Sequence, residues 1–141
     1  MVAYLDSSVV LRYILLGEIV LKHAAEFPRI VSSELLETEC RRVLLRTRME
    51  GKLNDETFVT ATERLEEVLA EMDLLELSGS VKKRAMEAFP VHVKTLDALH
   101  LASALELLGD MTAADVSVFS HDHTLNLCAR ALRFRAVLLR A

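Results

Sequence analysis

The sequence predicts an α/β protein in which helices pack on a central parallel sheet of four to five short strands. Two copies of one local pattern support this prediction. Residues 2–5 form an apolar run that leads directly into Asp6, and the helical pattern of residues 9–16 follows. Residues 115–119 form a second, largely apolar run, which leads into Asp122 and another helical pattern. Apolar strands that alternate with helices are typical of a parallel sheet covered on both faces.

The other elements follow from hydrophobic spacing and from Gly, Pro, Asn and Ser at the ends of periodic segments. We expect further helices at residues 18–27, 34–50, 55–72, 80–89 and 95–105. We expect further strands at residues 29–31, 74–77 and 134–139. No linker, internal repeat or biased segment separates these elements, so residues 1–141 are predicted to form a single domain.

The composition fits a globular chain and excludes several classes of protein. Hydrophobic residues make up 52% of the 141 residues, with only 4 Gly and 2 Pro, which excludes a disordered or low-complexity chain. No apolar run reaches the roughly 18 residues that a membrane span requires, and Asp6 and Arg12 interrupt any N-terminal signal sequence. Cys40 and Cys128 fall in helical patterns among apolar residues, which favours buried thiols over a disulfide. We therefore expect a cytoplasmic protein without a membrane segment.

Four acidic residues occupy positions that a parallel sheet would bring to one edge. Asp6 and Asp122 follow strands, Asp97 lies in the first turn of a helix, and Glu39 lies in the second turn of another. The carboxyl ends of parallel strands and the amino ends of the following helices share one edge of the sheet. Glu39 also lies on the apolar stripe of its helix, where an unpaired carboxylate is costly. These four carboxylates are therefore predicted to converge in one crevice.

Convergent carboxylates of this kind indicate a hard divalent cation. Four acids in a water-poor crevice repel one another unless cations neutralise them. Oxygen ligands select Mg²⁺ or Mn²⁺ over zinc, and such ions can hold a phosphodiester, activate water and stabilise the leaving oxygen. The net charge of −4 argues against bulk electrostatic binding of nucleic acid, but it does not exclude a nuclease that works through bound metal.

Each of these residues also has a purely structural interpretation, which the sequence leaves open. Asp6 and Asp97 are favoured at helix amino ends, where an acid caps the helix or interacts with its dipole. Glu39 could instead pair with Arg42, Arg46 or solvent at the edge of its stripe. His100, in the helix that carries Asp97, is expected to be a hydrogen-bonded core residue rather than a ligand.

Four segments, in order along the chain, resemble the PIN-domain family, and in particular the PIN-domain ribonuclease toxins of VapBC toxin–antitoxin modules. The segments are Asp6-Ser7-Ser8, Ser32-Ser33 with Thr38, Glu39 and Arg42, the run from Leu96 to Ala102, and Ser120-His121-Asp122 with Leu125. The run from 97 to 102 is fairly specific, and the resemblance spans nearly the whole chain because the four segments follow one another from residue 6 to residue 125. One departure is that the family often has Gly after the last helix, where this chain has Arg133 or Phe134.

The resemblance implies a PIN-like three-layer α/β/α fold and a Mg²⁺- or Mn²⁺-dependent endoribonuclease. It implies an acidic site made of Asp6, Glu39, Asp97 and Asp122, with Ser7, Ser8 or Ser120 orienting these acids by hydrogen bonding. It also implies in-line attack of water on phosphorus, which leaves 5′-phosphate and 3′-hydroxyl ends. The expected partners are an RNA substrate, a second copy of the chain in a homodimer, and a cognate antitoxin whose tail blocks the cleft.

Several alternatives stay open on the sequence. The chain could be a PIN nuclease that processes RNA without an antitoxin, or a catalytically silent α/β binding module whose acids only cap helices. A zinc hydrolase that uses His100, His121 and His123 is more distant, because the last two are expected to be exposed loop histidines. Candidate RNA contacts lie on the helix of Glu39, at Arg41, Arg42 and Arg46, although a solvated helix face has the same pattern.

Overall fold

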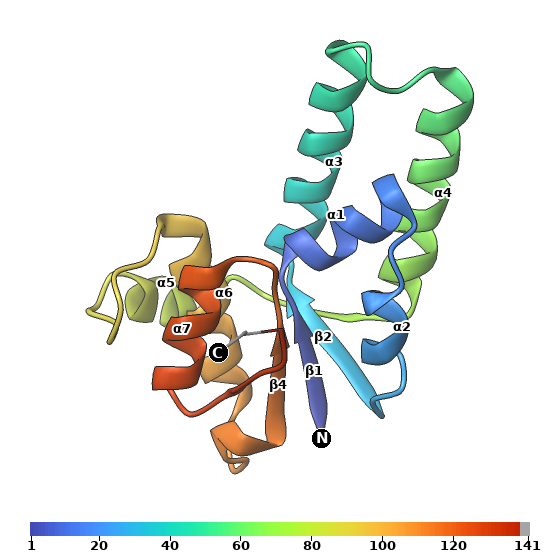
Figure 1. The fold of residues 1–141 in the computed structure, drawn as a ribbon. Coiled ribbons are helices and arrows are strands. Elements are labelled where there is room, and N and C mark those ends of the chain that lie inside the picture. The colour runs from blue at the N-terminus through green and yellow to red at the C-terminus, as the bar shows by residue number, and fades with distance from the viewer. Residues whose placement is uncertain (139–141) are drawn as a thin grey trace.

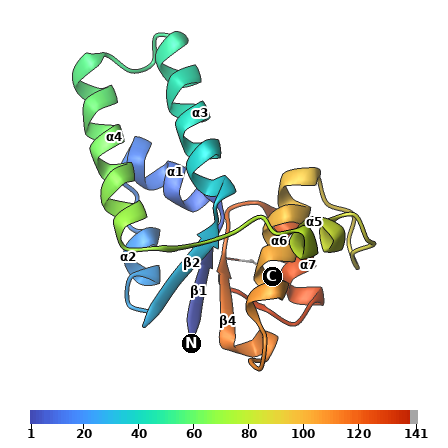
Figure 2. The ribbon, with the colours of Figure 1, turned by 180° about the vertical axis from the view of Figure 1, so that it is seen from behind.

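The computed structural model describes residues 1–138, in which a five-stranded parallel sheet lies between two layers of helices (Figure 1, Figure 2). The strands are β1 (Val2–Leu5), β2 (Arg29–Ser33), β3 (Asp73–Leu75), β4 (Val116–Phe119) and β5 (Arg135–Ala136), in the spatial order β3-β2-β1-β4-β5. The helices are α1 (Ser7–Leu16), α2 (Val20–Ala24), α3 (Leu35–Met49), α4 (Asp55–Ala70), α5 (Gly79–Ala85), α6 (Thr95–Leu107) and α7 (His123–Ala131), with a 3₁₀ turn η1 (Ala113–Asp115) before β4. None of the helices in this described range is long and apolar enough to cross a membrane. The predicted α/β class with a parallel sheet is confirmed.

The central strands are buried on both faces because their side chains alternate between two cores. On β1, Ala3 and Leu5 pack in the core formed with α1 to α4, whereas Val2 and Tyr4 pack in the core formed with α6 and α7. Figure 1 shows these two groups of helices on opposite sides of the sheet, with the α3–α4 pair projecting beyond it. This double burial is the physical reason that β1 and β4 are apolar along their whole length.

The starts of three helices coincide with capping residues that are visible in the sequence. Asp6 caps α1 by accepting a hydrogen bond from the Ser8 N–H at 2.7 Å. Asp122 caps α7 in the same way, accepting the Leu125 N–H at 2.8 Å. A capping box at Asn54 begins α4. The two strand–acid–helix units therefore form as predicted, with each acid at the junction.

Several elements are shorter than the sequence suggested. The helix expected at residues 18–27 is reduced to the five residues of α2, which begins after Ile19 without a side-chain cap and ends at Ala24. The strand expected at 74–77 becomes β3 and ends at Leu75, paired with Ser33, the last residue of β2. The closing strand expected at 134–139 contains only the two residues of β5, and its last expected residue lies outside the described part of the chain.

Helix α7 ends without a glycine, at a residue that adopts the conformation glycine usually supplies. Arg133 has φ 76°, the left-handed conformation in which glycine is usual. The Phe134 N–H then donates to the carbonyl of Ala129 at 3.0 Å, which closes the helix end. The cost of this conformation for a residue with a Cβ is about 1 kcal/mol, so the departure affects helix termination rather than the acidic edge.

Candidate acidic active site

The four predicted carboxylates lie at the carboxyl edge of the sheet. Asp6 follows β1 directly, and Asp122 lies just beyond β4. Asp97 is in the first turn of α6, and Glu39 is in the second turn of α3. These positions come from four different parts of the chain, and the parallel topology brings them to the same edge.

The acids at this edge influence one another electrostatically. The pKa of Asp97 is raised to about 6, first by burial and then by the negative charges of Asp122, Asp6 and Glu39. Asp97 does not cap its helix, because α6 begins at Lys94 without any side-chain cap. Asp97 still lies in the first turn of α6, where the helix dipole favours an acid, but burial and the other acids outweigh this effect on its pKa. A carboxyl group perturbed in this way is a candidate functional group.

Asp6 accepts hydrogen bonds from three donors, two on Ser8 and one on Ser120, which is distant in the sequence. Asp6 is 5% exposed, and its Oδ1 accepts from the Ser8 N–H at 2.7 Å and the Ser8 hydroxyl at 2.5 Å. Its Oδ2 accepts from the buried Ser120 hydroxyl, also at 2.5 Å. Ser120 Oγ in turn accepts the Asp122 N–H, and Ser8 Oγ accepts the His121 N–H, each at 2.9 Å. The loop that carries Asp122 is therefore tied to Asp6 through serine hydroxyls.

Glu39 is held at both carboxylate oxygens. Its Oε1 lies 2.6 Å from His100 Nε2, and its Oε2 accepts from the Ser7 hydroxyl at 3.2 Å. His100 is 2% exposed, and its Nδ1 lies 2.9 Å from the hydroxyl of Tyr4. The expectation that His100 is a hydrogen-bonded core residue agrees with this geometry. The alternative pairing of Glu39 with Arg42 is not what the structure contains.

The donor set of this site suits a hard divalent cation. Its candidate ligands are carboxylate oxygens, and their mutual repulsion at Asp97 is what a cation would relieve. Within residues 1–138, however, no group of three or more His, Cys, Asp or Glu side chains is arranged closely enough to hold a metal ion as it stands. The chemistry of the donors therefore fits the expected ion, while a preformed coordination shell is not part of the described structure.

The predicted arginines lie along α3 beyond the acids. Arg42 and Arg46 follow Glu39 by three and seven residues, so they continue the same face of the helix, and both are exposed. Arg46 Nε lies 3.7 Å from Glu50. Arg41 lies on another face of the helix and pairs with Glu37 at 2.8 Å. Of the three, Arg42 and Arg46 are better placed to extend the site.

The two histidines that flank Asp122 differ from the expected pair of exposed loop residues. His121 is partly buried, with its Nε2 4.0 Å from Glu18 Oε2, because its backbone is drawn in by the bond to Ser8. His123 is exposed, but it is the first residue of α7 and not part of the loop. Neither side chain forms part of a three-residue metal group in the described range.

Three residues that contact the site were not singled out from the sequence for this role. Tyr4 and His100 support Glu39, and Asn126 donates its Nδ2–H to the carbonyl of Ser120 at 2.8 Å. The available signals were spacings: Tyr4 precedes Asp6 by two residues, and Asn126 follows Asp122 by one helical turn. Such spacings predict that two side chains lie on the same face of a strand or helix, but they do not predict which hydrogen bonds those side chains form.

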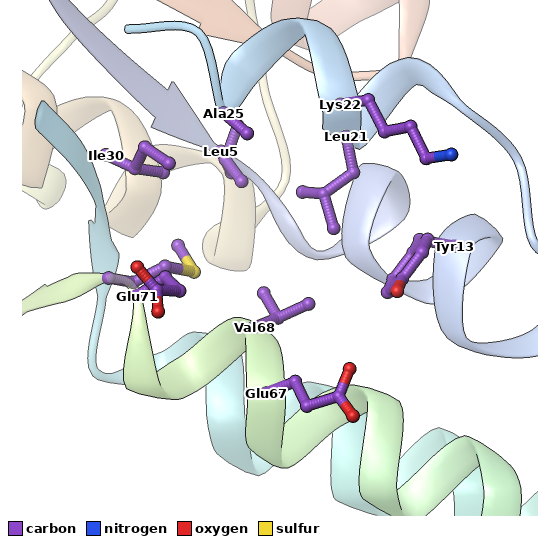
Figure 3. Close-up of a pocket in the computed structure, with 10 residues that line it drawn as sticks. Leu5, Tyr13, Leu21, Lys22, Ala25, Ile30, Glu67, Val68 and Glu71 are labelled. Atoms are coloured by element: carbon purple, nitrogen blue, oxygen red, sulfur yellow. The ribbon is translucent and has the colours of Figure 1, made fainter. Parts of the chain in front are cut away.

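An apolar pocket of about 230 Å³ lies in the layer formed by α1, α2 and α4, and none of the four acids lines it. Leu5 and Ile30 of the sheet, Tyr13 of α1 and Val68 of α4 contribute to its wall (Figure 3). Figure 3 also shows charged side chains at its edge, which are Lys22, Glu67 and Glu71.

The fold and the acid-lined edge define a class of protein, and the family comparison agrees with it. The PIN domain family model matches residues 3–126, and the chain belongs to the PIN-domain family. PIN domains are generally nucleases, and these nucleases typically use divalent metal ions.

Among solved structures, the crystal structure of PAE2754 from Pyrobaculum aerophilum is similar to this chain, with a TM-score of 0.58 and 19% sequence identity. The similarity covers 89% of this chain and 77% of that one, and at this identity it supports the fold alone. No curated protein matches the sequence.

Proposed function

We propose that this protein is a metal-dependent endoribonuclease and the toxin of a type II toxin–antitoxin pair. The observation that carries the nuclease proposal is the placement of four carboxylates at one edge of the sheet, where burial first, and then the charges of Asp122, Asp6 and Glu39, raise the pKa of Asp97 to about 6. A silent module whose acids only cap helices explains Asp6 and Asp122, which do cap. It does not explain Asp97, which caps nothing, or Glu39, which lies in the second turn of α3.

In this proposal, Asp6, Glu39, Asp97 and Asp122 would hold Mg²⁺ or Mn²⁺. The ion, when bound, supplies charge neutralisation for the scissile phosphate and lowers the pKa of a coordinated water. The protein supplies rigidity. Ser8 and Ser120 orient Asp6, while Ser7 and His100 orient Glu39, so these two acids keep few alternative orientations before the ion binds.

The proposed reaction is hydrolysis of an RNA phosphodiester bond. The oxygen of water forms a bond to phosphorus, and the bond from phosphorus to the 3′ oxygen breaks. The 3′ oxygen takes up a proton, which leaves 3′-hydroxyl and 5′-phosphate ends. Arg42 and Arg46, on the face of α3 that continues from Glu39, would contact the RNA backbone on its way to the acids.

The toxin role requires partners. The apolar pocket near α1, α2 and α4 supports binding of an antitoxin segment with apolar side chains, because Leu5, Leu21, Ile30 and Val68 contribute to its lining. The same proposal includes a homodimer, which exposed apolar residues on α3, Leu45 and Met49, support.

Cleavage by matched variants of α3 tests the nuclease proposal. Purified protein should cut cellular RNA in Mn²⁺ or Mg²⁺ and not in EDTA, and Glu39→Gln should reduce this cleavage by about 100-fold. Glu37→Gln removes the same charge two residues away, outside the site, and should cut as well as wild type. The proposal fails if no RNA is cut with either metal, or if Glu39→Gln cuts like wild type, which would assign the activity to a contaminant.

Growth of a bacterial host tests the toxin role separately. Expression of the wild-type chain should arrest growth, and expression of Glu39→Gln should not. Co-expression of a small gene adjacent to its own should relieve the arrest. RNA cleavage in vitro without growth arrest would favour the alternative nuclease that processes RNA without an antitoxin.

A further inference from the structure

Two buried side chains and one partly buried carboxylate form a line from the core of the protein to the acidic edge. The Tyr4 hydroxyl lies 2.9 Å from His100 Nδ1, and His100 Nε2 lies 2.6 Å from Glu39 Oε1. Tyr4 comes from β1, His100 from α6 and Glu39 from α3, so the line connects three elements. Tyr4 is 1% exposed and His100 is 2% exposed, whereas the Glu39 side chain is 16% exposed at the solvent end.

We propose that Tyr4 and His100 are positioning residues, which hold the carboxylate of Glu39 in the orientation needed to receive a divalent cation. This inference rests on the proposed function, because it assigns Glu39 to the metal site. Neither residue would touch the metal or the substrate, since His100 Nε2 is directed at Glu39 and Tyr4 lies behind His100.

The direction of the hydrogen bonds follows from the chemistry of the three groups. A Glu39 that binds a cation is a carboxylate and only accepts, so in this proposal His100 Nε2 carries the proton that it shares with Glu39. In a neutral imidazole the other nitrogen is then an acceptor, so the Tyr4 hydroxyl donates to Nδ1. Burial raises the pKa of Tyr4, against smaller lowering effects from the nearby Ser103 and Ser32 hydroxyls, which keeps the phenol protonated as a donor.

The ring of His100 is also fixed in place by packing. It meets the Tyr4 ring edge to face, with centroids 5.8 Å apart and an interplanar angle of 83°. Ser7 holds the other oxygen of Glu39, so the carboxylate is clamped from two sides. Groups that orient a metal ligand in this way typically change metal affinity or activity by about 10- to 100-fold when they are removed.

Removal of one hydroxyl tests the inference. Tyr4→Phe keeps the ring and its packing but leaves His100 Nδ1 without its donor. The matched control is Tyr13→Phe, because Tyr13 is the only other tyrosine in the chain and lines the apolar pocket instead. Tyr4→Phe should weaken Mn²⁺ binding, measured by titration calorimetry or by the free-Mn²⁺ spectrum, by about 3- to 10-fold. It should lower kcat for RNA cleavage and leave KM unchanged, while Tyr13→Phe should change none of these.

Two further comparisons separate positioning from general destabilisation. His100→Gln, which keeps an N–H donor, should retain more Mn²⁺ affinity than His100→Leu, which keeps none. In a Glu39→Gln background, Tyr4→Phe should have no additional effect on Mn²⁺ affinity, because its influence passes through the missing carboxylate. An equal effect of Tyr4→Phe with and without Glu39, or no difference between Tyr4→Phe and Tyr13→Phe, would overturn the inference.

The ¹⁵N spectrum of His100 gives a readout that needs neither metal nor RNA. The wild-type protein should show the tautomer protonated at Nε2, Tyr4→Phe should shift the Nδ1 signal, and Glu39→Gln should shift the Nε2 signal. If wild type shows these signals but binds no Mn²⁺, the proposed function fails while the hydrogen-bonded line to Glu39 stands. If His100 is protonated at Nδ1 instead, the positioning inference fails whatever the activity.

Discussion

Asp97→Asn should lower metal-dependent RNA cleavage by about 100-fold or more and should raise the melting temperature of the metal-free protein. The two effects have one cause. Burial and the charges of Asp122, Asp6 and Glu39 make ionised Asp97 unfavourable, with a smaller opposing effect from His100, and its pKa is raised to about 6. Asn has nearly the same shape and carries no charge, so it removes both a candidate metal ligand and the repulsion.

The pH dependence of this stabilisation has a definite sign. The pKa of Asp97 is higher in the folded chain, about 6, than its ordinary value of 3.8, so the folded state binds the proton more tightly. Its contribution to stability is therefore full below about pH 4 and is lost as the pH rises through 6. Asp97→Asn should gain about 1 kcal/mol at pH 8 after discounting for partial exposure, or about 3 °C, and should gain almost nothing at pH 4.

Thermal melts at pH 4 and pH 8 with EDTA measure this effect, and Asp110→Asn, an exposed acid outside the site, is the control. Addition of Mn²⁺ should reverse the order at pH 8, because only wild type gains stability from binding the ion. A variant that melts no higher than wild type at pH 8 without metal would mean that burial and the neighbouring acids do not disfavour ionised Asp97 as the structure indicates.

The parts of the fold that could be predicted from the sequence are those with local signals. β1 and β4 are apolar along their length because both faces are buried, and Asp6 and Asp122 stand where such strands turn into helices. A parallel sheet then requires that the carboxyl ends of these strands lie together. The edge strands β3 and β5 are short and partly exposed, so they carry too little hydrophobic pattern to set their bounds.

The supporting contacts of the candidate site could not be predicted because they join distant parts of the chain. His100 lies 61 residues from Glu39 and 96 residues from Tyr4, and their hydrogen bonds depend on how α3, α6 and β1 pack. The sequence does place His100 one turn after Asp97 on the same helix. Whether such a histidine is directed at solvent, the core or another acid is decided by tertiary packing alone.

Asp6→Ala should also abolish cleavage, but its effect on stability should be opposite to that of Asp97→Asn. Asp6 is buried, caps α1 and accepts three hydrogen bonds from Ser8 and Ser120. Loss of the cap costs about 1 kcal/mol, and the buried Ser120 hydroxyl left without its acceptor costs about 1–3 kcal/mol more. We expect a total loss of about 3 kcal/mol and a melting temperature lower by about 10 °C.

This loss is best measured at pH 5 without metal, where Asp97 is largely protonated and gains little from removal of the Asp6 charge. Asp6→Asn, which keeps one acceptor oxygen for the cap, should lose less stability than Asp6→Ala but a similar amount of activity.

A silent module whose acids serve only structure predicts that replacing either Asp6 or Asp97 destabilises the fold. A metal-dependent nuclease predicts that the two replacements change stability in opposite directions. Protein donors stabilise the Asp6 carboxylate, whereas the charge of Asp97 is disfavoured until a cation binds. If Asp6→Ala is as stable as wild type at pH 5, the hydrogen bonds from Ser8 and Ser120 to Asp6 do not stabilise the fold as the structure indicates.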